Sequence, residues 1–340
     1  MKYRTLGRSG LRVSELCLGT MTFGEDWGWG ASREESCRIF ETFASAGGNF
    51  IDTANNYTNG TSEKLLGEFI ASDREHYVVA TKYTLTERKP DPNFGGNHRK
   101  NLLRSLEGSL KRLKTDYVDL LYLHMWDGLT PVEEVMRALD DLVQAGKVLY
   151  LGISDTPAWV VSQANTLAGV RGWTQFVALQ IPYSLADRAV ERDLLPMGRA
   201  FGMGILPWGI LEGGELTGKY NSPSTGARRS KDADERVKNL AATVMAIASE
   251  LGRTPSQVAI NWVRQQPGNI IPILGARSES QILDNLGCLD FELASEQVKR
   301  LEAASPISLG FPHSFLSSDH VRSLIFGETY ALLDRDKSMV

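Results

Sequence analysis

Eight short apolar runs recur along the chain, and helical segments lie between them. The runs are rich in Val, Ile and Leu with little alternation, which is typical of parallel strands covered on both faces. They lie at residues 16–20, 49–53, 77–82, 118–124, 148–154, 176–182, 204–209 and 270–275. Apolar residues at helical spacing, with capping residues or glycine stops, mark residues 33–47, 62–70, 99–113, 130–146, 156–168, 237–252 and 255–266.

This repeat strongly limits the fold. Eight strand–helix units in a chain of 340 residues predict one (β/α)8 TIM barrel domain spanning residues 1–340. The alternative, an open doubly wound sheet, usually carries a G-x-G-x-x-G turn after its first strand. The sequence contains no such turn, so the closed barrel is favoured.

Both ends of the chain fall outside the repeat. The start, "YRTLGRSGLRVSEL", predicts a β-hairpin that turns at residues 8–10 and plugs the bottom of the barrel. The C-terminal tail from Pro306 contains Phe311, Phe315 and Phe326. Because it is too aromatic for a solvated tail, we expect it to pack over one end of the barrel.

Composition excludes several classes of protein. The net charge is −4 and the basic residues are scattered, which argues against a nucleic-acid-binding or anionic-membrane surface. The N-terminus lacks an apolar signal-peptide core, and no apolar run reaches about 18 residues. Three distant cysteines, outside metal-ligand spacing, predict reduced thiols, no metal site and a cytoplasmic location.

Polar residues of a particular kind stand at the ends of neighbouring apolar runs. Asp52 ends the second run, Tyr57 lies in the loop behind it, Lys82 ends the third and His124 ends the fourth. In a (β/α)8 barrel the active site lies at the C-terminal ends of the strands. The topology therefore brings these four side chains to one rim.

Together the four side chains could donate a proton to a carbonyl oxygen. The ordinary pKa of tyrosine is about 10, and an adjacent lysine ammonium lowers it. An aspartate bound to the lysine holds the ammonium in place, and a neutral histidine orients the carbonyl. Reduction of a carbonyl by hydride needs such a general acid.

Each residue alone also has an ordinary explanation. A strand-end lysine is commonly ion-paired or solvated, a single histidine is commonly structural, and Asp52 could cap the turn before Ala54. Four such residues at consecutive strand ends are much harder to ascribe to chance.

At these residues the sequence resembles the aldo-keto reductase family. The resemblance covers nearly the whole chain, from "LCLGTMTFG" (16–24) to "GARSESQILDNL" (275–286), and is greatest to the aryl-alcohol dehydrogenase-like and potassium-channel β-subunit-like branches. It implies a (β/α)8 barrel and reversible reduction of an aldehyde or ketone to an alcohol. It also implies that Tyr57 is the proton donor, that Lys82 and Asp52 tune it, and that His124 orients the carbonyl.

The cofactor that the resemblance implies is NADP(H), bound across the strand ends. "GISDTPAW" is similar to the family's Gly-Val-Ser-Asn segment, except that Asp155 replaces an amide by a carboxylate that can only accept hydrogen bonds. The implied cofactor residues are Ser154, Asp155, Gln180, Trp208, Gly209, Leu211, Gly213, Lys219, Gly275, Arg277, Ser278, Gln281 and Asn285.

Two of these residues have specific implied roles. Trp208 would stack on the nicotinamide, although plain barrel packing is a serious alternative. Arg277 stands at a strand-to-helix turn that suits a 2′-phosphate, hence NADP over NAD, although a solvated arginine would also be ordinary there.

The substrate is expected to be a small-molecule carbonyl or alcohol. Trp27, Trp29 and Trp126 are the candidate substrate residues, and they favour an apolar or aromatic compound. A homo-oligomer remains open. One other function stays open, a redox-sensing regulatory module that binds NADPH and a protein partner. A hydrolase or aldolase that uses Lys82 as a Schiff-base nucleophile would not explain Tyr57 or the turn at Arg277.

Overall fold

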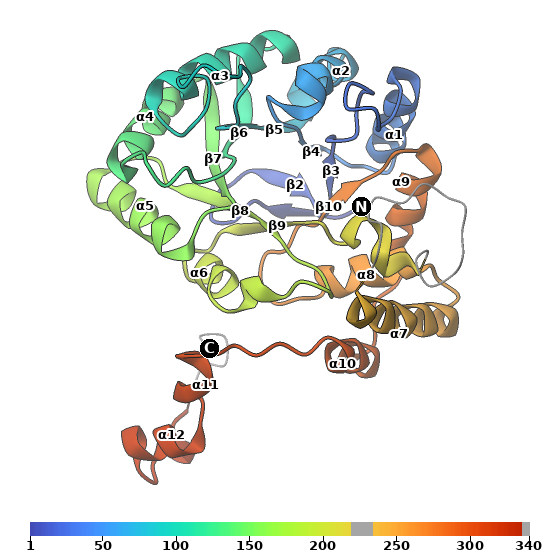
Figure 1. The fold of residues 1–340 in the computed structure, drawn as a ribbon, viewed down its shortest axis with the longest axis vertical. Helices are drawn as coiled ribbons and strands as arrows, with labels where there is room; N and C mark the ends of the chain where they lie inside the picture. The colour runs from blue at the N-terminus through green and yellow to red at the C-terminus, as the bar shows by residue number, and fades with distance from the viewer. Residues whose placement is uncertain (219–233, 335–340) are drawn as a thin grey trace.

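Eight parallel strands form the centre of the computed structural model, which describes residues 1–218 and 234–334 (Figure 1). The strands are β3 (Cys17–Gly19), β4 (Phe50–Asp52), β5 (Val78–Tyr83), β6 (Val118–Leu123), β7 (Val148–Ser154), β8 (Phe176–Pro182), β9 (Gly204–Trp208) and β10 (Ile273–Gly275). They pair in the order β10-β3-β4-β5-β6-β7-β8-β9. A parallel bridge between Ile205 and Ile270 joins the two ends of this sheet. The predicted (β/α)8 barrel is confirmed.

Helices surround the sheet on its outer face (Figure 1). They are α1 (Arg33–Ser45), α2 (Thr61–Phe69), α3 (Arg99–Leu113), α4 (Val132–Gln144), α5 (Ala158–Arg171), α6 (Leu194–Ala200), α7 (Glu235–Leu251), α8 (Pro255–Arg264), α9 (Glu279–Leu286) and α10 (Ser295–Ala304). Local sequence explains their starts. The side chain of Ser32 caps α1, and Thr254 forms a capping box with Gln257 at the start of α8. Helix α4 begins two residues later than expected because Pro131 has an extended ψ of 138°.

The apolar core has two parts. The larger part lies between the sheet and the helices and includes Phe43 and Trp262, both fully buried. The smaller part fills the barrel itself with residues such as Phe50, Leu120 and Tyr122. This filled interior leaves the site chemistry to the strand ends.

The predicted N-terminal hairpin is confirmed. Strands β1 (Tyr3–Thr5) and β2 (Arg12–Ser14) pair antiparallel. Leu6 and Val13 are completely buried in the inner core of the barrel. The hairpin therefore closes the end of the barrel opposite the site described below.

The C-terminal tail corrects one expectation. It does not pack over an end of the barrel, because Phe311 is 85% and Phe315 56% exposed. Figure 1 shows α11 (His313–Leu316) and α12 (Asp319–Phe326) lying away from the helical ring. The aromatic side chains pack against one another instead: the rings of Phe311 and Phe315 lie 6.1 Å apart. An aromatic composition alone does not say which surface the rings contact.

Among residues 1–218 and 234–334, no helix is long and apolar enough to cross a membrane.

Candidate active site

Three neighbouring strands deliver the predicted tetrad to one end of the barrel. Asp52 is the last residue of β4, Lys82 lies near the end of β5, and His124 directly follows β6. These strands are hydrogen-bonded neighbours in parallel register. Residues far apart in sequence therefore meet at one rim.

Lys82 is the centre of the hydrogen-bond network. Its side chain is fully buried, and its Nζ lies 2.5 Å from Asp52 Oδ2, 2.9 Å from the Thr53 carbonyl oxygen and 3.1 Å from the Tyr57 hydroxyl. An ammonium has three protons to donate, and these three acceptors match them. Gln180 donates from its side-chain amide to the other oxygen of Asp52 at 2.9 Å. The Lys82–Tyr57 contact is thus held in a fixed orientation.

A turn with unusual backbone geometry places Tyr57 over the barrel. Thr58, Asn59 and Gly60 all have positive φ, at 44°, 54° and 87°. The φ of Gly60 favours glycine, and a Cβ there would lie 2.8 Å from Arg112 Cδ, so a larger residue would also displace the Arg112 side chain. Thr58 Oγ1 donates to the Phe23 carbonyl oxygen at 2.6 Å and accepts from the Ser62 amide at 3.0 Å. These contacts stabilise a turn that most residues would disfavour.

The pKa of Tyr57 shifts in the opposite direction to the one expected. Burial raises the pKa of the hydroxyl above its ordinary value, and the nearby Lys82 ammonium only partly offsets this effect. Burial also acts against the charged form of Lys82, but Asp52 and Tyr57 outweigh it and raise the pKa of the ammonium. Tyr57 is therefore held protonated next to a charged lysine, as a proton donor should be.

His124 is neutral in this site. Burial lowers the pKa of the imidazole to about 3, with a smaller contribution from the Lys82 charge. Its ring centre lies 6.1 Å from that of Tyr57, edge to face. A neutral imidazole beside the phenol can donate a hydrogen bond to a carbonyl oxygen without adding a charge.

The predicted nicotinamide residues lie at the ends of the next strands. Ser154 ends β7 and pairs in register with Gln180 of β8, and both are buried. Asp155 follows with a φ of 38°; burial raises the pKa of its carboxyl, and the Trp208 side chain partly offsets this by favouring the ionised form. Trp208 is 40% exposed at the end of β9, so it is not part of the barrel core.

The remaining cofactor residues line the adjoining rim. Gly209 and Gly213 have φ of 73° and 60°, and a Cβ at Gly209 would meet no atom within 4 Å. Leu211 is partly buried next to them. Lys219 lies outside the described residues. An open glycine surface beside an exposed indole fits a flat, extended ligand.

The start of α9 holds the predicted adenosine-end residues. Ser278 caps the helix, and the Gln281 side chain accepts from the Arg277 amide at 2.8 Å. Asn285 donates to the Gly275 carbonyl oxygen at 3.4 Å. The Arg277 side chain is exposed and makes no ion pair within the described parts of the chain. A free guanidinium at a helix N-terminus fits a phosphate group.

Carboxylates also lie near this helix start. Glu35 accepts a hydrogen bond from the Glu279 amide at 2.6 Å, so one of the first amides of α9 already has an anionic partner. A phosphate at Arg277 would depend on the guanidinium and on the other amides.

Of the predicted substrate residues, Trp27 lies nearest to the tetrad. Its ring packs edge to face on Tyr57, with centres 6.5 Å apart, and its other neighbour is Trp29 at 5.6 Å. Trp126 is partly buried, and its amide donates to the Asp155 carbonyl oxygen at 3.3 Å. All three tryptophans belong to loops that follow barrel strands.

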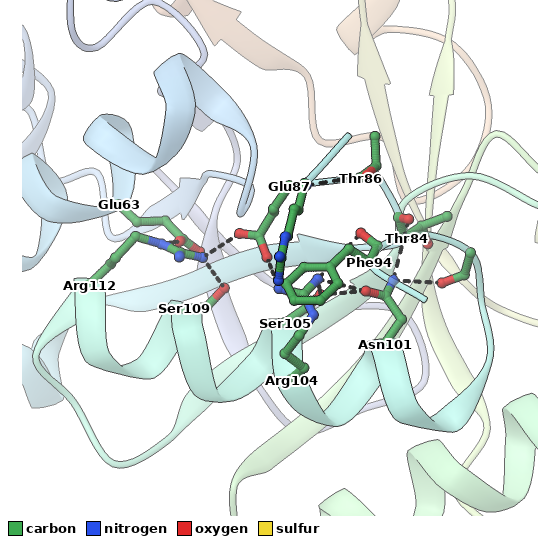
Figure 2. A network of polar contacts seen from close by, with 12 residues as sticks. Glu63, Thr84, Thr86, Glu87, Phe94, Asn101, Arg104, Ser105, Ser109 and Arg112 are labelled. Carbon is green, nitrogen blue, oxygen red and sulfur yellow. Dashed lines mark hydrogen bonds and ion pairs between the residues drawn. The ribbon is translucent and has the colours of Figure 1, made fainter. Parts of the chain in front are cut away.

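A polar network behind the tetrad was not predicted from the sequence (Figure 2). Arg112 of α3 donates to Glu63 of α2 at 2.6 Å and to Glu87 of the loop after β5 at 3.1 Å. Glu63 is fully buried and accepts from Thr81 Oγ1, the residue before Lys82, at 2.6 Å. The network connects the Tyr57 turn, the Lys82 strand and the following loop. The one sequence signal for this network is Glu63, an acidic residue six positions after Tyr57.

A second connection fixes the loops after β5 and β6 to each other. The Asn97 amide donates to Asp127 at 2.7 Å, and the Asp127 amide donates to the Asn97 side chain at 2.7 Å. Asn97 also donates to the Met125 carbonyl oxygen at 3.0 Å. Because Met125 follows His124, this pair supports the backbone beside the imidazole.

Comparison with known proteins agrees with this geometry. A family model described as "Aldo/keto reductase family" matches residues 15–306. A norsolorinic acid reductase from Aspergillus flavus is 40% identical over 92% of this chain and 84% of its own length. An aryl-alcohol dehydrogenase from Pestalotiopsis microspora is 41% identical, covering 93% and 85%. A putative aryl-alcohol dehydrogenase from Saccharomyces cerevisiae is 38% identical, covering 94% and 90%.

The matched region contains every strand of the barrel and all four side chains at its rim. The chain belongs to the aldo/keto reductase family of oxidoreductases, which act on small-molecule carbonyl substrates.

Proposed function

We propose that this protein is an NADP(H)-dependent reductase of aldehydes or ketones, reversibly an alcohol dehydrogenase, with Tyr57 as proton donor. The observation that carries the proposal is the contact of 3.1 Å between the Tyr57 hydroxyl and a buried Lys82 ammonium that is itself paired with Asp52. The bound nicotinamide would supply the hydride. The protein's own side chains would bind the carbonyl and provide the proton.

Proton donation follows from the arrangement around Tyr57. As hydride reaches the carbonyl carbon, negative charge develops on the oxygen, which takes the proton of the phenol. The Lys82 ammonium, 3.1 Å away, stabilises the phenolate that remains. Asp52 keeps the ammonium charged and in place. Water then reprotonates Tyr57 before the next turnover.

His124 would bind the same oxygen from a second direction. Its pKa of about 3 keeps the ring neutral at physiological pH, so it orients the carbonyl without competing as an acid. Two donors on one oxygen fix the carbonyl for attack on one face.

The cofactor residues support an extended dinucleotide along the rim from β7 to α9. Trp208 offers an exposed aromatic face for the nicotinamide end, and Arg277 offers an unpaired guanidinium for the 2′-phosphate end. Ser154 and Gln180 stand between the tetrad and Trp208, although Gln180 already donates to Asp52.

Aromatic carbonyl compounds are the substrate class that we favour. Trp27 packs directly on Tyr57, with Trp29 behind it, so a flat ring would find aromatic partners beside the proton donor. The names of the relatives, an aryl-alcohol dehydrogenase among them, point the same way.

The test is a kinetic screen of aromatic, aliphatic and sugar-derived carbonyls with NADPH and with NADH. We expect NADPH oxidation with aromatic aldehydes or ketones. The Tyr57→Phe variant should lose roughly 100- to 10,000-fold in kcat, the range that general acids contribute, while its Kd for NADPH changes little.

Two outcomes would contradict the proposal. A Tyr57→Phe variant with a near-normal rate would remove the proton-donor role. A wild-type protein that binds NADPH but reduces no carbonyl in the panel would favour a regulatory, partner-binding function instead.

A further inference from the structure

The strand-end site contains a carboxylate without a basic partner. Asp155 directly follows β7 and is partly buried, which raises the pKa of its carboxyl, while the nearby side chains of Trp208 and Ser154 partly offset this by favouring the ionised form. Within residues 1–218 and 234–334, no basic nitrogen lies within 4.0 Å of its carboxylate. The charge of Lys82 lowers the pKa of Asp155 slightly, but this ammonium is already bound to Asp52, Thr53 and Tyr57.

A balance of charges shows why this carboxylate matters. Lys82 and Asp52 neutralise each other as a direct ion pair. His124 is neutral, and Tyr57 is protonated. Among these five side chains, the ionised Asp155 is therefore the one charged group without an ion pair. This charge is close enough to the tetrad to contribute to the raised pKa of Tyr57.

Hydride transfer creates a positive charge in the same space. A C–H bond of the reduced nicotinamide breaks, its hydrogen and electron pair form a C–H bond on the carbonyl carbon, and the oxygen takes the Tyr57 proton. The neutral ring becomes a cation. Reacting atoms must approach to about 3–3.5 Å. A carbonyl oxygen bound by Tyr57 would therefore require the nicotinamide ring to lie at the same strand ends as Asp155.

We propose that Asp155 stabilises the oxidised, positively charged nicotinamide in this site and so makes bound NADPH a stronger hydride donor. This inference rests on the proposed function. A carboxylate gains nothing from the neutral reduced ring but attracts the cation, so the interaction grows as the reaction proceeds. Across several ångströms in a partly buried site, such an attraction changes a binding constant by roughly tenfold.

The same charge has a consequence for product release. Tighter binding of the oxidised cofactor slows its departure, so the gain in the hydride step is offset at the end of the cycle. An amide at this position would remove both effects together.

The experiment measures equilibrium binding, not turnover. We would determine the Kd values of NADP+ and of NADPH by quenching of tryptophan fluorescence for the wild type and for Asp155→Asn. Asparagine keeps the size of the side chain and one acceptor oxygen, removes the charge and turns the other oxygen into an NH2 donor. We expect the ratio of the Kd for NADP+ to that for NADPH to rise roughly tenfold.

Two further variants keep the test specific. Asp155→Glu retains the charge and should keep the ratio within about twofold of the wild type. Asp319→Asn removes one negative charge from the exposed tail, far from the site, and should leave the ratio unchanged. Asp155→Ser provides a second neutral variant if the asparagine variant is unstable, and it should raise the ratio as asparagine does.

The results separate this inference from the proposed function. If both cofactor forms bind and the neutral variants leave the ratio unchanged, the role of Asp155 is wrong while the reductase proposal stands. If the wild type binds neither form, both proposals fail.

Discussion

Arg277 is the residue that should determine the choice between NADP(H) and NAD(H). Its guanidinium is exposed and unpaired at the start of α9. We expect Arg277→Ala to raise the Kd for NADPH roughly ten- to hundredfold, the value of one hydrogen-bonded charge, and the Kd for NADH much less. Titration by fluorescence would measure both. Equal losses for the two cofactors would show that Arg277 does not bind the 2′-phosphate.

His124 should make the stability of the protein depend on pH. Its pKa is about 3 in the folded protein and about 6.5 when unfolded, so between these values only the unfolded chain binds the proton. Its contribution to stability is present above pH 6.5 and is lost as the pH falls towards 3. Glutamine has no group that titrates in this range. As the pH falls, the free energy of unfolding of the wild type should therefore decrease relative to that of His124→Gln, by up to about 1.4 kcal/mol per pH unit.

Urea unfolding at several pH values between 6.5 and 4.5 would measure this difference. Curves for the two proteins that stay parallel across the range would contradict a buried neutral imidazole.

At the scale of single residues, the sequence predicted which side chains meet but not all of their electrostatics. Strand ends in a known topology are enough to bring Asp52, Lys82 and His124 together. The predicted direction of the Tyr57 pKa shift was wrong. Burial raises this pKa, and its effect outweighs the lowering effect of the Lys82 charge. Burial depends on what packs around the phenol, Trp27 included, and a single sequence does not specify this packing.

The loop after β5 is anchored through charged side chains on α3. Glu87 binds both Arg104, at 2.6 Å, and Arg112, at 3.1 Å (Figure 2). The Phe94 ring of the same loop lies under Arg104, 4.1 Å from the guanidinium carbon to the ring centre. Together with the Asn97–Asp127 pair, this carboxylate holds the loop beside the tetrad.

We expect Glu87→Gln to raise KM for the carbonyl several-fold while kcat changes little, because Glu63 still holds Arg112 at 2.6 Å. Steady-state kinetics with saturating NADPH would measure this. The matched control is Glu250→Gln, which removes half of the exposed Glu250–Arg300 ion pair on the outer helices and should change neither constant. A fall in kcat without a change in KM would show that Glu87 acts on the catalytic turn instead.

At the scale of elements, apolar periodicity predicted each barrel strand and seven of the helices, because both are encoded within one segment of the chain. Polar contacts between elements are not encoded in this way. Glu63 and Glu87 looked like ordinary acidic residues until α2, α3 and the loop were placed side by side. The Asn97–Asp127 pair was not predicted for the same reason: it joins two loops that are far apart in sequence.

For the whole molecule, the tail should be separable from the barrel. Within the tail up to residue 334, the last backbone hydrogen bond to the helical ring is made by the Ser308 carbonyl oxygen, which accepts from Arg192 at 3.1 Å. Beyond it, Leu324 is 71% and Ile325 59% exposed. A chain ending at Gly310 should therefore keep its Tm within about 2 °C and bind less of a hydrophobic dye than the full chain.

Thermal unfolding and dye fluorescence would measure these effects. A chain ending at Ala294 is the contrasting control, since it also loses α10 and its fully buried Leu301, and it should unfold at a clearly lower temperature. A large loss of stability in the Gly310 variant would show that the tail contributes to the barrel after all.

The seam of the barrel has a consequence for folding. Strands β4 to β8 pair on both sides with their neighbours in sequence. Strand β3 has such a neighbour only on one side, and its other partner is β10. Strand β9 likewise pairs with β8, and its other edge contacts the segment before β10 through the bridge between Ile205 and Ile270. During synthesis, β3 and β9 are therefore unpaired edges until Ile273 and its neighbours leave the ribosome. The tetrad, whose last residue in the sequence is His124, is synthesised long before that. A chain interrupted in the interval would carry its catalytic groups on a sheet still able to pair with another chain.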